Sequence, residues 1–314
     1  MLSKLFSNIK LGLSLWLILF SLALWSLTFY LNCSECFSNF TASEWTEISG
    51  ISILLIASLF LSSNIFNSFF HVTQKNYYVP LFLAIFISWA AIPLQWESTF
   101  SLFLMAVFYL NTYNILNGKD NNQVGFHLTA GVLSLILTWL TPIAIGFLAL
   151  SFWQAIVDSH GGWRKYILPF YSFAFSFLIL LGLAFVFDYQ NEFIAKFKLW
   201  DQLSFDLDRL KSNAIQASLA VFFFLLSQIE YLRALRKAPI LKRKILSILN
   251  VQFTISFVLF VLFGSNLESL LIALFALSVL FANYLQYLKK FIRREFLIWI
   301  SIGAGILSAS VNLL

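Results

Sequence analysis

Long apolar runs, separated by short polar segments, occupy almost the whole chain. A helix needs about 20 mainly apolar residues to cross the hydrocarbon core of a bilayer, because it rises about 1.5 Å per residue. Two spans are predicted in the segment 124–157, where Thr141-Pro142 indicates a break, since proline lacks a backbone donor and restricts the residue before it. The other predicted spans are 11–31, 48–70, 80–94, 99–116, 166–187, 214–232, 245–263, 269–288 and 296–313, which makes eleven in all.

The basic residues predict the orientation, because short cytoplasmic loops retain Lys and Arg. With a cytoplasmic N-terminus and two spans in 124–157, every Lys and Arg lies inside except Lys196, Lys198, Arg209 and Lys211. A single span there would place the clusters 233–244 and 289–294 outside. We therefore predict an all-α, polytopic transmembrane helix bundle of about eleven spans, forming one membrane domain over residues 1–314, with a cytoplasmic N-terminus and a periplasmic C-terminus.

The first apolar run, 11–31, also follows two lysines, as the apolar part of a signal peptide does. It is longer than the usual apolar region of about 7–15 residues, and no cleavage site of small residues follows it. We expect it to remain as the first span.

Composition excludes a soluble protein. Charged residues make up 11% of the chain, against about 25% in soluble domains, and the mean hydropathy is +0.85. The net charge of +6 is too scattered for a nucleic-acid interface and divides into a positive inner and a negative outer face. The expected partners are membrane lipids, including anionic lipids at Arg233–Lys244, and not nucleic acid.

The longest segment between spans, 188–213, is predicted to lie outside. Its apolar residues recur at helical spacing, with Phe193, Phe197 and Trp200 on one face. An amphipathic helix lying in the membrane interface would show this pattern. A soluble cap that packs its apolar face on neighbouring loops would show it equally well.

Cys33 and Cys36 lie in the first outside loop, three positions apart. A redox-active pair of the kind found in membrane thiol oxidases needs a second pair, and this chain has 2 cysteines. A passive disulfide or two unpaired thiols is the favoured interpretation.

Two glutamates in the same loop, Glu44 and Glu47, are the candidate catalytic residues. A carboxylate there can serve as a general base or help to hold a divalent metal and a phosphate leaving group. Outside loops also carry acidic residues simply because basic residues are retained inside.

Polar residues within the spans cluster in the cytoplasmic half. The steps between Asn64, Asn67 and His71 place them on one helical face, and Asn111, Asn114 and His127 lie at a similar depth. They could line a wet cavity that admits a head group or a small polar solute. Hydrogen bonding between helices is the favoured alternative. Glu230 is close enough in sequence to pair with Arg233.

The sequence lacks the common catalytic and cofactor-binding motifs. The chain contains no nucleotide-binding loop, zinc-protease motif, nucleophile elbow or haem-attachment motif, and its 3 histidines make no convincing metal site. No cofactor is evident, although a transferase would call for a divalent metal. The segment Asp158–Lys165 is interpreted as a tight turn, with phosphate binding as the alternative.

The stretch 64–164 resembles an uncharacterised family of bacterial polytopic inner-membrane proteins, a domain of unknown function. The resemblance rests on Asn67 with Phe69 and Phe70, on Thr73-Gln74-Lys75-Asn76-Tyr77, and on the paired spans before Trp163-Arg164-Lys165. It implies a place in the bacterial inner membrane. More distantly, the hairpin around Leu140-Thr141-Pro142 is similar to one in GT-C glycosyltransferases, which use polyprenyl-phosphate sugars. Those enzymes carry an essential acidic residue in a first outside loop that is longer than the one here.

Two functional hypotheses follow. One is a protein of the cell envelope that handles a lipid-linked substrate, such as a GT-C-like sugar transferase or a degenerate relative of one. The other is a non-enzymatic subunit or assembly factor whose aromatic helices pack against partner membrane proteins.

Overall fold

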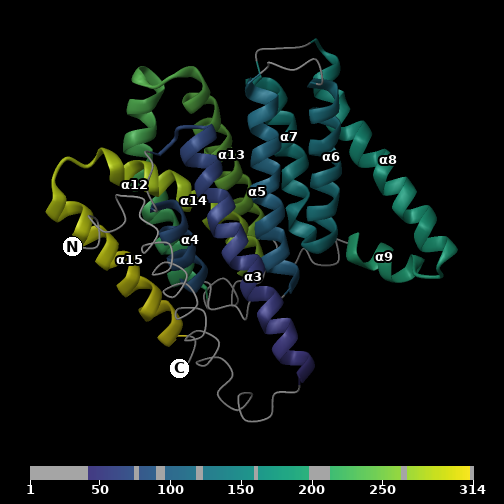
Figure 1. Ribbon diagram of the computed structural model, residues 1–314, viewed down its shortest axis with the longest axis horizontal. Helices are drawn as coiled ribbons and strands as arrows, with labels where there is room; N and C mark the ends of the chain where they lie inside the picture. Colours follow the sequence, from purple (N-terminus) through teal and green to yellow (C-terminus); the bar gives the residue numbers. More distant parts are fainter. Residues whose placement is uncertain are drawn as a thin grey trace.

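A computed structural model of the chain describes residues 42–73, 78–89, 96–117, 123–158, 162–197, 213–262 and 267–311. In these residues the structure is built from helices and contains no strand (Figure 1). Seven of the helices are long and apolar enough to cross a membrane. The protein is thus an all-α, polytopic membrane bundle, as the sequence predicts. The first predicted span and the pair Cys33 and Cys36 lie outside the described residues.

Every predicted span within the described residues is helical. The helices of spanning length are α3 (Ala42–Asn64) with the π-helical turn η2 (Ile65–Phe69), α5 (Trp96–Asn117), α6 (Gln123–Leu140), α8 (Arg164–Val186), α12 (Ala214–Lys237), α13 (Ile240–Leu262) and α14 (Leu267–Tyr287). The others are α4 (Tyr78–Trp89), α7 (Gly146–Val157), α9 (Gln190–Phe197) and α15 (Phe291–Val311).

Serine and threonine hydroxyls within these helices bond to backbone carbonyls of their own helix. Ser58 Oγ donates to Leu54 O at 2.7 Å, and Thr112 Oγ1 donates to Phe108 O at 2.8 Å. A buried polar group without a partner is costly in an apolar environment. These local bonds therefore let the apolar spans carry hydroxyl groups.

The centre of the bundle is α14, which packs against α4, α12 and α13. Its Phe281 ring meets Phe82 at 4.9 Å and Phe223 at 4.8 Å between centroids, both edge-on. A helix that is apolar on all sides suits such an enclosed position.

The break predicted at Thr141-Pro142 is confirmed. Helix α6 ends at Leu140, the 3₁₀ turn η3 (Pro142–Ile145) follows, and α7 packs back against α6. The 12 residues of α7 reach only about 18 Å at 1.5 Å per residue. The segment 124–157 therefore forms a hairpin of one full-length and one short helix.

Helix α8 crosses α6 closely and then leaves the bundle (Figure 1). At the crossing, Ser172 Oγ donates to Leu128 O at 2.6 Å. Where the helices diverge, α9 turns back toward α8, and the Phe193 ring lies 5.6 Å from that of Phe177. An apolar cavity of about 520 Å³ lies between Trp139, α8 and α9. In its described part, the predicted 188–213 helix packs on the spanning helix α8, and the choice between an interfacial helix and a cap on neighbouring loops stays a prediction.

The basic run 233–244 differs from the loop that its charges suggest. Helix α12 continues to Lys237 and α13 begins at Ile240, so most of the run lies on helix ends. Ala238 is extended, with ψ 156°, because a residue before proline avoids the helical region. This hairpin lies at the same end of the bundle as the starts of α6 and α8, at the top of Figure 1.

Candidate functional site

Two cavities share Tyr287 as a wall, at the end of the bundle formed by the α12–α13 hairpin. The smaller, which we call the Lys242 cavity, measures about 340 Å³ and is lined by Asn67, His71, Val72, Thr73, Lys242, Gln286 and Tyr287. The larger, which we call the basic cavity, measures about 640 Å³ and is lined by Glu230, Arg233, Ala234, Arg236, Lys237, Ala238, Pro239, Tyr287 and Lys289.

Lys242 is a buried cation. It is 6% exposed, and its Nζ donates to Val72 O at 2.5 Å and to the Tyr287 hydroxyl at 3.0 Å. The ammonium also lies 4.9 Å from the centre of the Tyr287 ring. Lys242 takes part in none of the ion pairs found among the described residues. Its charge is therefore balanced by dipoles and a ring, and not by a carboxylate.

The end of α3 shapes the Lys242 cavity. The helix widens at η2, where Phe70 N–H donates to Ile65 O at 3.1 Å, five residues back. His71 then takes a left-handed conformation, with φ 50°, which is uncommon for a residue other than glycine. The chain reverses there, and the Val72 carbonyl reaches Lys242. Wide turns of this kind are frequent at functional sites.

Asn67 and Thr73 secure this reversal. Thr73 Oγ1 donates to Asn67 Oδ1, and Asn67 Nδ2 donates to Ser63 Oγ at 3.1 Å. All three side chains are buried. The polar groups at this wall of the Lys242 cavity thus hold one another in place.

The basic cavity carries four cations and one carboxylate. Arg233 Nη1 lies 3.3 Å from Glu230 Oε2, and the Glu230 side chain is 8% exposed. The predicted pairing of Glu230 with Arg233 is therefore confirmed. Arg236, Lys237 and Lys289 leave the cavity with a net positive lining.

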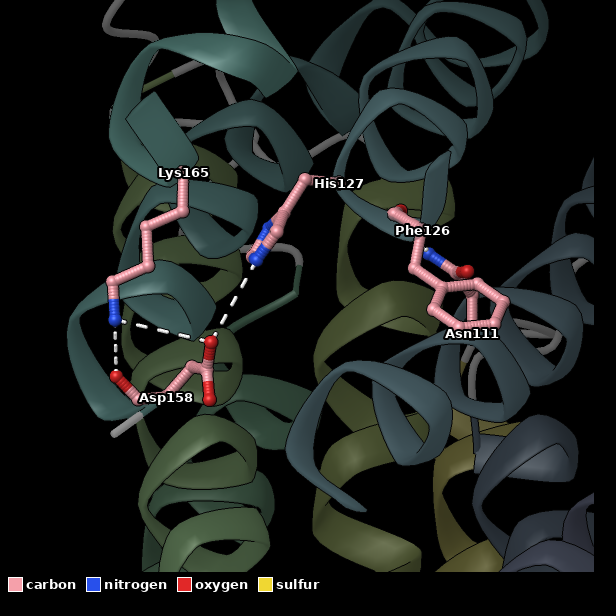
Figure 2. A network of polar contacts seen from close by, with 5 residues as sticks. All are labelled: Asn111, Phe126, His127, Asp158 and Lys165. Carbon is pink, nitrogen blue, oxygen red and sulfur yellow. Dashed lines mark hydrogen bonds and ion pairs between the residues drawn. The ribbon is translucent and has the colours of Figure 1, made fainter. Parts of the chain in front are cut away.

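A separate polar network joins α6, α7 and α8 (Figure 2). His127 Nε2 and Lys165 Nζ each lie 3.8 Å from Asp158 Oδ2, and Lys165 also donates to the Asp158 carbonyl. The three side chains are buried. Lys165 turns inward to Asp158, whereas the turn predicted between them includes residues 159–161, which lie outside the described residues.

Many polar residues of the spans join helices to one another. Asn111 Nδ2 donates to Phe126 O at 2.9 Å, next to His127. Gln154 Nε2 donates to Thr112 Oγ1 at 2.6 Å, and Gln228 Nε2 donates to Asn250 Oδ1 at 2.5 Å. Hydrogen bonds of this kind hold membrane helices together.

The predicted site residues fall into three groups. Asn67 and His71 line the Lys242 cavity, whereas Asn64 is exposed, because the chain widens at η2 and the three residues do not share one face. Asn111 and His127 belong to contacts between helices, and Asn114 is half-buried near them.

The candidate catalytic residues Glu44 and Glu47 lie in the first turns of α3, which begins at Ala42 and so extends into the predicted loop. Their side chains lie outside the part of the chain for which side chains are described. Among the described residues, no group of three or more His, Cys, Asp or Glu side chains is placed to hold a metal ion.

Lys242 and Tyr287 were missed as site residues by sequence reasoning, which counted Lys242 only as part of the basic run. A signal was present, since Lys242, Ile245, Leu249 and Gln252 recur at helical spacing and are all buried. No comparable pattern indicates that Asp158 and Lys165 belong to a network with His127, because His127 is distant from both in sequence.

Comparisons with family models, with curated proteins and with solved structures found no match to the chain.

Proposed function

We propose that this multi-pass membrane protein belongs to the bacterial inner membrane, as part of the cell envelope, and binds the anionic head group of a lipid or a lipid-linked substrate. The basic cavity carries the proposal. Its four cations face one carboxylate, and that carboxylate is already paired with Arg233. The remaining positive charge suits a phosphate-bearing head group at the membrane surface.

The orientation that we propose puts this end of the bundle in the cytoplasm. The positive-inside rule supports it, because both basic clusters, 233–244 and 289–294, contribute cations to the lining of the basic cavity. In a variant with Cys33→Ser and Cys36→Ser, single cysteines at Asp120, His160 and Trp200 test it. Impermeant reagents should label position 200 in intact cells and spare positions 120 and 160. External labelling at position 160 contradicts the orientation.

Binding of the head group is tested with purified protein in mild detergent and short-chain phosphatidylglycerol. Each cation near an anionic lipid contributes about 1 kcal/mol, so replacing three cations lowers the affinity by up to about a hundredfold. The test variant carries Arg236→Gln, Lys237→Gln and Lys289→Gln.

The control variant removes the same amount of charge at the same end of the bundle, with Arg164→Gln, Lys290→Gln and Arg293→Gln. These three residues are exposed and line neither cavity. Native mass spectrometry should show bound lipid in the control and little in the test variant. Equal binding by both variants contradicts the proposal.

Transferase chemistry is a separate proposal for the outer end of the bundle, with Glu44 and Glu47 as acid/base residues or as ligands of a divalent metal, because the proposed orientation puts these glutamates outside and the basic cavity inside. The test is complementation of a deletion strain by the double variant Glu44→Ala and Glu47→Ala. Loss of complementation with normal protein abundance supports the transferase. Full complementation contradicts the transferase proposal and leaves the lipid-binding proposal as it was.

A second candidate function is that of a subunit or assembly factor, and the exposure of α8 favours it. Only 11% of the spanning window of α8 is buried, less than in any other described span. Photo-crosslinking in cells at Phe175 and Leu178, both exposed, tests the idea. A protein adduct of one defined mass supports a partner, whereas adducts with lipid alone indicate a helix that faces the bilayer.

A further inference from the structure

The geometry points to a subsite for a single phosphate group in the Lys242 cavity, with the Lys242 ammonium as its counter-ion and His71 as a second contact. The inference deepens the proposed function. It rests on that function for one point, that the phosphate is part of a lipid head group. Free inorganic phosphate offers the same chemistry and serves as a second probe.

The first argument is the charge of Lys242. Removing an ammonium from water carries a heavy free-energy penalty, which a nearby opposite charge offsets. Lys242 is 6% exposed, yet no ion pair among the described residues includes it. A bound anion would supply the missing countercharge.

The second argument is the remaining hydrogen-bonding capacity. An ammonium group has three donors. The Val72 carbonyl and the Tyr287 hydroxyl accept from two of them. Since Lys242 lines the cavity, the third donor is placed to serve a ligand there.

The third argument is the lining of the cavity. Among the described residues, none of the acidic side chains contributes to it, and its polar side chains come from Asn67, His71, Thr73, Lys242, Gln286 and Tyr287. A phosphate therefore meets no like charge at this wall. At about 340 Å³, the cavity lies near the lower limit of about 300 Å³ for small-molecule sites. It suits a head-group phosphate, while the lipid chains stay in the bilayer.

The start of α13 adds positive electrostatic potential beside the Lys242 ammonium. Lys242 lies in the first turn of this helix, where the backbone N–H groups form the positive end of the helix dipole. A cation is disfavoured at this end unless an anion joins it, and anions bind readily to helix N-termini. The dipole and the ammonium thus favour the same ligand.

A purely structural role is the competing explanation, because Lys242 also ties the end of α3 to α13 and α14. His71 separates the two. It is exposed and lines the cavity, so His71→Gly should weaken phosphate binding several-fold. Because glycine readily adopts the left-handed conformation of this position, the thermal unfolding of the unliganded protein should change little. A structural role for Lys242 does not predict this result.

The experiment uses the full chain in two arms. Inorganic phosphate is titrated into protein in mild detergent, followed by ³¹P line broadening and by the unfolding temperature. Phosphatidylcholine vesicles doped with phosphatidic acid then measure binding of a lipid phosphate. Lys242→Gln should weaken binding in both arms by about tenfold or more, since a hydrogen bond to a charged group contributes that much. Lys290→Gln, with an exposed cation outside the cavity, is the control and should bind as the wild type does.

The outcomes separate the two proposals. If Lys242→Gln and His71→Gly bind both probes as the wild type does, the subsite is refuted, and the proposed function stands or falls with the basic cavity. If those variants lose binding while the triple variant of the basic cavity keeps it, the subsite stands and the basic cavity is refuted. Should Lys242→Gln fail to fold, His71→Gly decides, together with the phosphate-dependent rise in the unfolding temperature of the wild type.

Discussion

Close packing of α6 on α8 leaves less room for an added side chain at Gly131 than at any other described glycine. A Cβ at this position would lie 2.2 Å from Pro169 O and 3.0 Å from Ser172 Cβ. Both neighbours belong to α8, so relief requires the helices to move apart. The hydrogen bond from Ser172 to Leu128 O spans the same crossing and would be stretched. Gly131→Ala therefore perturbs the junction that carries Lys165.

Opposing terms set the magnitude. Overpacking costs about 1–3 kcal/mol, and a hydrogen bond between membrane helices contributes about 0.6 kcal/mol. Replacing glycine by alanine within a helix returns up to about 1 kcal/mol. Gly131→Ala should therefore lower the free energy of unfolding by about 1–2 kcal/mol.

Unfolding by sodium dodecyl sulfate in mixed micelles, followed by circular dichroism, measures this change. Gly182→Ala is the matched control, because it lies on α8 and a Cβ there meets no heavy atom within 4 Å. The control should be as stable as the wild type or slightly more so. If Gly131→Ala is as stable as Gly182→Ala, the close crossing of α6 and α8 is refuted.

Three further substitutions test other contacts by the same unfolding assay. Asp158→Asn should lower the free energy of unfolding by about 3–5 kcal/mol, because it leaves buried Lys165 without its countercharge. Adding Lys165→Met should recover part of this loss. Strictly additive effects of the two substitutions would contradict the pairing. Tyr109→Phe should cost about 1–3 kcal/mol, because its hydroxyl donates to buried Gln252, and an unchanged stability would show that Gln252 finds another partner. Arg233→Gln should lower the free energy of unfolding by about 1–3 kcal/mol, because it leaves the Glu230 side chain, 8% exposed, without its charged partner. An unchanged stability would show that another cation of the basic cavity replaces Arg233.

Local signals predicted much of the fold. The hairpin between α6 and α7 follows from the Thr141-Pro142 break together with the positions of the basic clusters. Helix α12 ends at Lys237, beyond the predicted limit of its span at 232, although Pro239, which forces Ala238 out of the helical region, was a local signal for this end. These features depend on residues that are neighbours in the chain, so the pattern alone carries them.

The end of α3 shows where such reasoning stops. Regular helical spacing predicts that Asn64, Asn67 and His71 share a face, but the π-helical turn changes the spacing, and His71 lies beyond it. One additional residue per turn rotates every later side chain. No local rule places that turn, because the contacts that stabilise it come from Asn67, Thr73 and the distant Lys242.

By itself, the sequence determined that the chain is a bundle of apolar helices with its cations gathered in a few short segments, because span length and composition are local properties. Only the tertiary structure decided which polar groups meet: Asp158 with His127 and Lys165, and Lys242 with Val72 and Tyr287. The physical reason is that a buried charge must find its partners in space. Asp158 and Lys165 are near neighbours in the chain, but His127 for the one site and Val72 and Tyr287 for the other come from helices distant in sequence, which helix packing brings together.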